Sequence, residues 1–262
     1  MQVISSKDNE IIKNIRKLKE KKYRDLENAY IIEGIKLVKE AITEKAKIKQ
    51  IVMCENFADN QEIDKETLYE IAKYNLIYVT EKVFNLITDV KTPQGIIAII
   101  EKNKINQIDY SQDMIIALDG VQDPGNLGTI LRTADSAALN QIIISKNSAD
   151  PYNNKVVRST MGGIFRVNII EVDNLEETLK EIQKNKFKIM VTSLDTNNSI
   201  YEVDYNKKVI VIGNEANGVS KEVQAIADEK VKIPMLGKTE SLNAAVATGI
   251  MIYEYVRRKI EL

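Results

Sequence analysis

The fold class follows from residues 114–135, which read Met-Ile-Ile-Ala-Leu-Asp-Gly-Val-Gln-Asp-Pro-Gly-Asn-Leu-Gly-Thr-Ile-Leu-Arg-Thr-Ala-Asp. A continuous apolar segment, 114–118, passes through a polar loop into a helical pattern. Such uninterrupted segments are typical of strands buried in a parallel sheet. Further strands are expected at 141–145, 167–172, 188–193, 209–213 and 230–233, and helices at 127–138, 174–185, 220–227 and 242–258. This alternation predicts an α/β fold in which helices cover both faces of a parallel sheet.

A smaller α/β part precedes this sheet. Its strands are expected near 30–33, 48–53 and 76–80, and its helices at 35–44, 64–74 and 81–87. Near the N-terminus, an apolar face of Ile11, Ile12, Ile15 and Leu18 follows possible helix caps at Ser5 and Ser6. The polar stretch 102–112 separates the two parts, so we expect domains at 1–105 and 106–262.

Composition excludes several kinds of chemistry. The 262 residues include 37 Lys+Arg, 38 Asp+Glu, one cysteine and no histidine. Catalysis by a Ser-His-Asp or Cys-His arrangement is therefore excluded, as is a histidine-ligated metal, and we expect no metal site. The lone Cys54 favours a reducing, cytoplasmic setting. With no signal-peptide pattern and no run of eighteen apolar residues, we expect neither secretion nor a membrane span.

Three loops that follow predicted strands are rich in polar and turn residues. Ligands of parallel α/β sheets bind at the carboxyl ends of the strands, where these loops lie. The loop after 114–118 carries Asn126, which is expected at or near the helix cap and has capping alone as its simplest role. Arg132 follows among apolar neighbours, so we expect it to be partly buried against an anion. The loop 213–220 carries Glu215, and the loop 233–247 leads into a small-residue helix start.

Two familiar phosphate motifs are absent. Gly237-Lys-Thr239 resembles the end of a P-loop, but Lys232 stands where that motif requires its first glycine. The spacing of Gly120, Gly125 and Gly128 does not match a dinucleotide fingerprint. Neither ATP hydrolysis nor NAD chemistry is supported.

Taken together, the three loops resemble the three motifs of the SpoU, or TrmH, family of RNA ribose 2'-O-methyltransferases. The matching stretches are Asn126-Leu-Gly-Thr-Ile-Leu-Arg132, then Ile212-Gly-Asn-Glu215 with Gly218-Val-Ser220, and finally Ile233-Pro-Met235 with Ser241-Leu-Asn243. Lys22-Tyr-Arg24, Ile32-Glu-Gly34 and Gln94-Gly95 are similar to the family's RNA-binding N-terminal domain. Ala216 stands where the family often has glycine, and Asn140 where glycine commonly ends the first helix.

The resemblance implies a deep trefoil knot near the C-terminus, with S-adenosylmethionine bound in the knotted loops and two copies packed as a homodimer. The residues implied to contact the cofactor are Leu194, Gly213, Asn214, Gly218, Ile233, Met235, Ser241 and Leu242. The residues implied to act in catalysis are Arg132, Asn126, Glu215, Ser241 and Asn243.

For the reaction itself, the resemblance assigns the role of base to Arg132. An arginine side chain stays protonated in proteins, so we interpret Arg132 first as a clamp for the phosphate beside the reacting ribose, with or without a part in proton transfer. Asn126 would orient the hydroxyl, while Glu215, Ser241 and Asn243 would hold Arg132 and the loops. A basic helix at 7–24 has two interpretations: it selects the RNA, or it is an ordinary solvated helix face rich in lysine.

Three other readings are open. One is a SpoU-like RNA-binding assembly factor without catalysis, and another is an α/β enzyme that uses a different nucleotide. Within the family, the substrate is ribosomal RNA or transfer RNA. The two-domain length favours ribosomal RNA, but the sequence does not identify the nucleotide.

Overall fold

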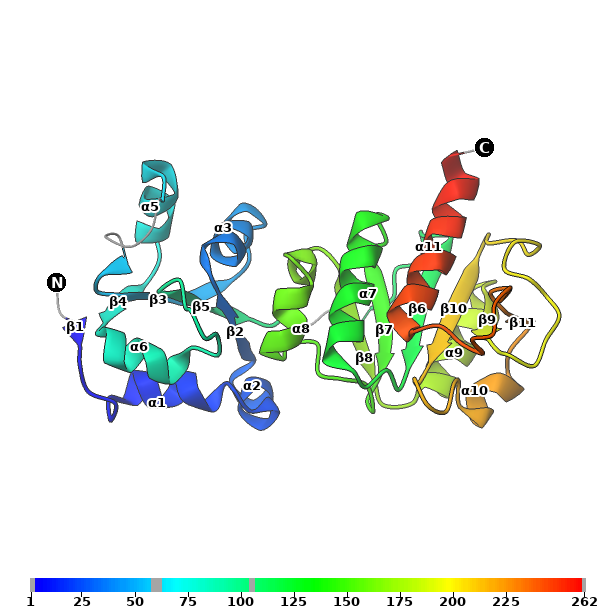
Figure 1. The fold of residues 1–262 in the computed structure, drawn as a ribbon, viewed down its shortest axis with the longest axis horizontal. Coiled ribbons are helices and arrows are strands. Elements are labelled where there is room, and N and C mark those ends of the chain that lie inside the picture. The colour runs from blue at the N-terminus through cyan, green and yellow to red at the C-terminus, as the bar shows by residue number, and fades with distance from the viewer. Residues whose placement is uncertain (1–2, 58–62, 104–106, 261–262) are drawn as a thin grey trace. The chain divides into compact units, whose positions relative to one another are not determined.

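The computed structural model describes residues 3–57, 63–103 and 107–260, which form two compact units (Figure 1). The first unit comprises Met1–Asn103 together with Tyr152–Phe165, and the second comprises Lys104–Pro151 together with Arg166–Leu262. The sequence predicts an uninterrupted C-terminal domain. The structure differs because a segment between two strands of the second unit packs into the first.

The first unit is built on a mixed five-stranded sheet. The strand order is β1-β4-β3-β5-β2, and β5 runs antiparallel to both of its neighbours. Its strands are β1 (Val3–Ile4), β2 (Ala29–Glu33), β3 (Ile48–Cys54), β4 (Leu76–Val79) and β5 (Ile96–Glu101). Its helices are α1 (Glu10–Lys17), α2 (Lys21–Glu27), α3 (Ile35–Thr43), α5 (Lys65–Ala72), α6 (Glu81–Ile87) and α8 (Asn154–Ser159). The smaller α/β unit predicted from the sequence is thus present.

The basic N-terminal segment forms two helices rather than one. Asn9, not Ser5 or Ser6, caps α1, because its side chain accepts a hydrogen bond from the backbone N–H of Ile11 at 2.9 Å. The Arg24 side chain, only 3% exposed, donates to the carbonyls of Leu18 (2.8 Å) and Lys19 (2.7 Å). Carbonyls just past the end of α1 are thereby satisfied. Arg24 consequently has a structural role.

The segment Tyr152–Phe165 packs through aromatic and apolar contacts within the first unit. The Tyr152 ring lies 4.9 Å from the ring of Tyr30, and the Lys102 ammonium lies 4.7 Å above Tyr152. Val156 and Val157 of α8 are buried. This helix was not predicted, because six residues are too few to show helical periodicity.

The second unit contains the predicted parallel sheet. All neighbouring strands run parallel, in the order β11-β9-β10-β6-β7-β8. Its strands are β6 (Met114–Asp119), β7 (Gln141–Ser145), β8 (Asn168–Val172), β9 (Lys188–Thr192), β10 (Lys208–Gly213) and β11 (Glu229–Val231). Its helices are α7 (Pro124–Ser136), α9 (Leu175–Lys184), α10 (Lys221–Ala225) and α11 (Ala244–Ile260).

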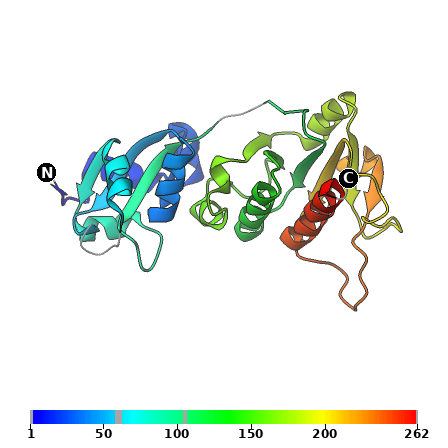
Figure 2. The same ribbon diagram turned by 90° about the horizontal axis from the view of Figure 1, so that it is seen from above.

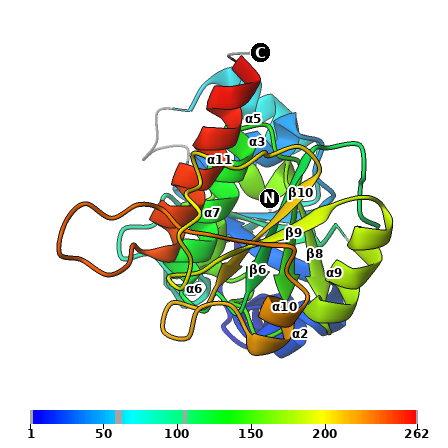
Figure 3. The same ribbon diagram turned by 90° about the vertical axis from the view of Figure 1, so that its right-hand side faces the viewer.

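Helices cover both faces of this sheet, as predicted. Figure 3 shows α7 and α11 on one side and α9 on the other. Leu179 and Ile182 of α9 and Val223 of α10 join a buried cluster with alternate residues of the strands. None of the helices in the described ranges is long and apolar enough to cross a membrane. The trefoil knot implied by the resemblance stays a prediction.

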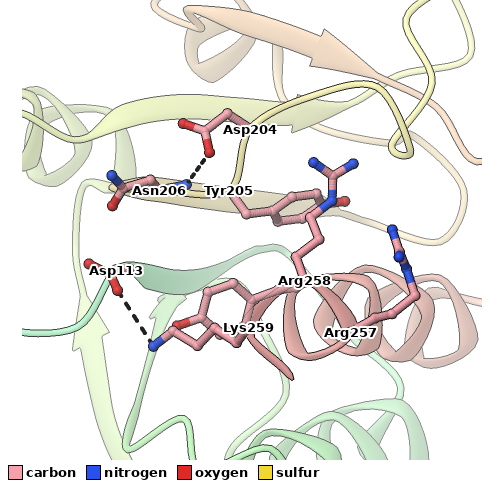
Figure 4. Close-up of a pocket in the computed structure, with 8 residues that line it drawn as sticks. Asp113, Asp204, Tyr205, Asn206, Arg257, Arg258 and Lys259 are labelled. Carbon is pink, nitrogen blue, oxygen red and sulfur yellow. Dashed lines mark hydrogen bonds and ion pairs between the residues drawn. The ribbon is translucent and has the colours of Figure 1, made fainter. Parts of the chain in front are cut away.

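A pocket of about 790 Å³ lies at the amino end of this sheet, where Asp113 precedes β6 and Asn206 precedes β10 (Figure 4). The last turn of α11 forms one wall of the pocket. Glu254 lies one turn earlier, where hydrogen bonds from Arg257 and Arg258 outweigh the effect of burial and lower the pKa of Glu254 to about 2. The pocket is therefore at the opposite end of the strands from the three motif loops.

Candidate active site

The first motif loop enters α7 through an Asp-Pro pair. Asp123 caps the helix by accepting a 2.8 Å hydrogen bond from the backbone N–H of Asn126, and Pro124 occupies the first helical position. Asn126 therefore lies within the first turn, near the cap as predicted, but the capping residue itself is Asp123. The Asp-Pro signal was present in the sequence and identifies the true cap. The Asn126 side chain is left for another role.

The side chain of Asn126 is fixed by residues of the other two motifs. Its Nδ2 donates to the Glu215 carboxylate at 2.8 Å, and its Oδ1 accepts from Nδ2 of Asn243 at 2.9 Å. A carboxylate only accepts hydrogen bonds, so Asn126 must turn its amide nitrogen toward Glu215. Asn243 is oriented in turn by capping α11, because its Oδ1 accepts from the backbone N–H groups of Ala245 (2.9 Å) and Val246 (3.2 Å).

Glu215 also binds the backbone of the first loop. Its two carboxylate oxygens accept from the N–H groups of Gln122 and Asp123, each at 3.3 Å. Partial burial raises the pKa of Glu215, but the hydrogen bonds from Asn126 and these backbone groups outweigh it and bring the pKa below its ordinary value. Glu215 is thus an ionised anchor between two loops.

The second motif loop is folded tightly against the first. Strands β10 and β6 pair in register up to Gly213 and Asp119. Beyond that point Asn214 donates from Nδ2 to the Gly120 carbonyl at 2.8 Å, and the Ser220 N–H donates to the Asp119 carboxylate at 2.8 Å. A Cβ atom on Gly213 would lie 2.0 Å from the carbonyl carbon of Gly218, so only glycine fits there. The loop therefore closes directly on its own strand.

The residues implied to contact the cofactor lie at, or just beyond, the carboxyl ends of β9, β10 and β11. Strands β11, β9 and β10 are parallel neighbours, so the loops that follow them open on the same side. The Leu194 side chain is 67% exposed after β9, and Gly218 has open space where a side chain would stand. In the loop after β11, which projects from the sheet in Figure 2, Ile233, Met235 and Leu242 are half-buried and Ser241 is exposed. Exposed backbone and apolar side chains of this kind fit a nucleoside cofactor.

Arg132 differs from its prediction. It lies on α7 with its side chain exposed rather than partly buried. Its apolar neighbours Leu131 and Ile130 face the sheet, and the helical rotation places Arg132 on the outer face. Glu215 and Asn243 hold the motif loops together through Asn126, as predicted, but their side chains do not hydrogen-bond to Arg132. The catalytic role of Arg132 stays a prediction. The guanidinium is accessible to a large anionic ligand.

Comparison with known proteins identifies the class. Residues 113–253 match the SpoU rRNA Methylase family, and residues 9–98 match the MRM3-like substrate binding domain. The chain belongs to the SpoU rRNA methylase family.

Of three particular relatives, two match nearly the whole chain, and the third matches little more than half of it. The chain is 32% identical, over 97% of its length and 98% of the relative's, to the 23S rRNA (guanosine(2553)-2'-O)-methyltransferase RlmP of Bacillus subtilis. It is 36% identical to the 23S rRNA (guanosine-2'-O-)-methyltransferase RlmB of Xanthomonas axonopodis pv. citri, over 56% of this chain and 59% of that one. The crystal structure of an AdoMet-bound rRNA methyltransferase from Sinorhizobium meliloti is 33% identical, covers 98% of both chains and has a TM-score of 0.86.

Proposed function

We propose that this protein methylates a ribose 2'-hydroxyl of 23S ribosomal RNA with S-adenosylmethionine as the methyl donor. The observation that carries the proposal is the hydrogen-bonded chain from Asn243 through Asn126 to Glu215, which joins all three motif loops. The relatives named above support the ribosomal substrate and the cofactor. A cytoplasmic location follows from that substrate.

Asn126 and Arg132 have different roles: one orients the ribose hydroxyl and the other binds a phosphate. Asn126 keeps one N–H and one lone pair after its bonds to Glu215 and Asn243, and these are suited to orient the ribose hydroxyl. Arg132 is placed to bind the phosphate beside that ribose through its planar, permanently charged fork. S-adenosylmethionine, when bound in the loops after β9, β10 and β11, supplies the methyl group. Gly213, Asn214 and Gly218 would shape its site, with Leu194, Ile233, Met235, Ser241 and Leu242 lining it.

The direct test uses unmodified RNA and cofactor labelled in its methyl group. The full chain is incubated separately with 23S rRNA, with 16S rRNA and with transfer RNA, and the methylated ribose is mapped. We expect label on 23S rRNA alone. Label on transfer RNA would show that transfer RNA, and not 23S rRNA, is the substrate. Binding to RNA without any methyl transfer would identify an assembly factor instead.

We also propose that the first unit binds the RNA through the region around Tyr23. The ammonium groups of Lys17 and Lys22 lie 5.9 Å and 5.8 Å from the Tyr23 ring centroid, and both lysines are exposed. An aromatic ring flanked by cations suits an unpaired base and its phosphates. Lys19 is instead paired with Asp89 at 2.8 Å, so only part of the basic segment 7–24 is suited to this role.

The double variant Lys17→Gln with Lys22→Gln should weaken RNA binding without changing kcat at saturating RNA. Loss of two phosphate contacts should make the negative slope of log affinity against log salt shallower by about 2. Filter binding across a salt series measures this slope. Lys65→Gln, an exposed lysine at the start of α5, is the control and should change nothing. Because Tyr152–Phe165 packs in the first unit, point variants are preferable to deletion of residues 1–105. An unchanged slope contradicts the assignment.

We further propose a homodimer formed through the outer face of α11. Val246, Tyr253 and Ile260, spaced by seven residues, are 51%, 50% and 80% exposed. This spacing forms an apolar stripe along one helix face, which a second copy of the same face would bury. Sedimentation should show two chains for the wild type and one for Tyr253→Glu. A monomeric wild type at micromolar concentration contradicts the proposal.

A further inference from the structure

The loop after β7 touches the first motif loop, although none of the three motifs includes it. Ser145, the last residue of β7 and only 7% exposed, accepts a 2.8 Å hydrogen bond at Oγ from the backbone N–H of Gly120. Four residues later, the N–H of Ala149 donates to the Val121 carbonyl at 2.8 Å. Two consecutive residues of the first motif loop are thus held by the chain that follows β7.

The Ser145 hydroxyl is oriented by its own neighbour. It donates to Oδ1 of Asn147 at 2.5 Å, which directs an oxygen lone pair toward Gly120. The Asn147 amide also lies over Gly120: a Cβ on that glycine would come within 2.9 Å of Asn147 Nδ2. Gly120 has a φ of +73°, a left-handed conformation that must be held by its surroundings.

The same loop, residues 120–123 between β6 and α7, is held from the other side by the second motif loop. Asn214 binds the Gly120 carbonyl, and Glu215 binds the N–H groups of Gln122 and Asp123. The peptide units around Gly120 are therefore held between Ser145, the last residue of β7, and Asn214, the first residue after β10. The helix α7, which carries Asn126 and Arg132, begins immediately after this loop. The backbone of the loop therefore fixes the position of the helix and of both side chains.

We propose that Ser145 and Asn147 are positioning residues for methyl transfer, acting through the backbone of Gly120. This inference rests on the proposed function. Without the Ser145 hydroxyl, the buried N–H of Gly120 loses its acceptor, and the loop shifts toward a conformation that satisfies it. A displacement of about 1 Å at a reacting group lowers rates by roughly 100-fold, whereas RNA binding by the first unit does not depend on this loop.

Steady-state kinetics with the full chain test the proposal. Ser145→Ala should lower kcat by about 10- to 100-fold while the KM for RNA changes by less than about threefold. Ser145→Thr keeps the hydroxyl and should restore most of kcat. Asn147→Ala removes an exposed side chain, so the fold is retained even if Ser145→Ala unfolds, and it should lower kcat by about 3- to 10-fold.

The matched control is Lys146→Ala, in the same loop. Lys146 pairs with Asp173 at 2.8 Å in an exposed ion pair, so its removal should leave kcat and KM unchanged. If the wild type transfers methyl groups and both Ser145→Ala and Asn147→Ala match Lys146→Ala, the positioning role is refuted while the proposed function stands. A wild type without transfer refutes both.

Discussion

Arg132→Lys should leave the protein folded and able to bind its cofactor, yet lower kcat by at least about 100-fold. The substitution keeps the positive charge but replaces a planar, two-pronged donor with a single ammonium, which cannot grip a phosphate in the same fixed geometry. Since the Arg132 side chain is exposed on α7, its replacement should alter the free energy of unfolding by less than about 0.5 kcal/mol.

Three measurements separate a catalytic loss from a general one. Methyl transfer at saturating RNA gives kcat, calorimetry gives the affinity for S-adenosylmethionine, and thermal melting gives stability. Arg257→Lys is the matched control, because Arg257 lies in the last turn of α11, at the far end of the sheet, and Arg258 still pairs with Glu254. Near-normal turnover by Arg132→Lys would show that charge alone suffices, and the phosphate-clamp role would then be wrong.

The arrangement of the second unit could be predicted from the sequence because its strands are apolar on both faces. Short apolar runs such as 114–118 and 209–213, which alternate with helical patterns, predict central strands of a parallel sheet. Neither the separate helix α8 nor its place in the first unit was foreseeable, since Pro151, Asn153 and Val156 carry only a local signal. Which unit a short helix packs against depends on long-range contacts such as Tyr152 with Tyr30.

The residues of the site could be predicted from the sequence, but the hydrogen bonds between them could not. Resemblance placed Asn126, Glu215 and Asn243 in one site, and the structure brings them within hydrogen-bond distance. The resemblance did not show that Asn126 binds both Glu215 and Asn243 while Arg132 faces outward. Apolar neighbours in the sequence do not indicate which side of a helix a residue occupies. The role of Ser145 could not be predicted from the sequence for a related reason. A serine at the end of a strand follows no distinctive pattern, and its partner, the backbone N–H of Gly120, is known only from the structure.

Gly213→Ala is expected to have the second large effect, on both stability and cofactor binding. The added methyl would lie 2.0 Å from the carbonyl carbon of Gly218 and 2.1 Å from the nitrogen of Val219. Both are backbone atoms, so no side-chain rotation relieves the collision. The loop must open, which breaks the paired 2.9 Å hydrogen bonds between Asn214 and Gly218. Overpacking of this kind costs about 1–3 kcal/mol, and the displaced loop should lower cofactor affinity by more than about tenfold.

Gly249→Ala provides the contrast, because the substitution is identical and the surroundings differ. A Cβ at Gly249, inside α11, would meet its nearest neighbour, Thr133 Cγ2, at 3.8 Å, an ordinary contact. Removing a glycine from a helix interior should therefore stabilise the protein by about 0.5–1 kcal/mol. Denaturant unfolding should show a lower free energy of unfolding for Gly213→Ala and a higher one for Gly249→Ala. Cofactor titration should show a loss of affinity only for Gly213→Ala. If Gly213→Ala binds the cofactor as tightly as Gly249→Ala, then the closure of the 213–218 loop does not form the cofactor site.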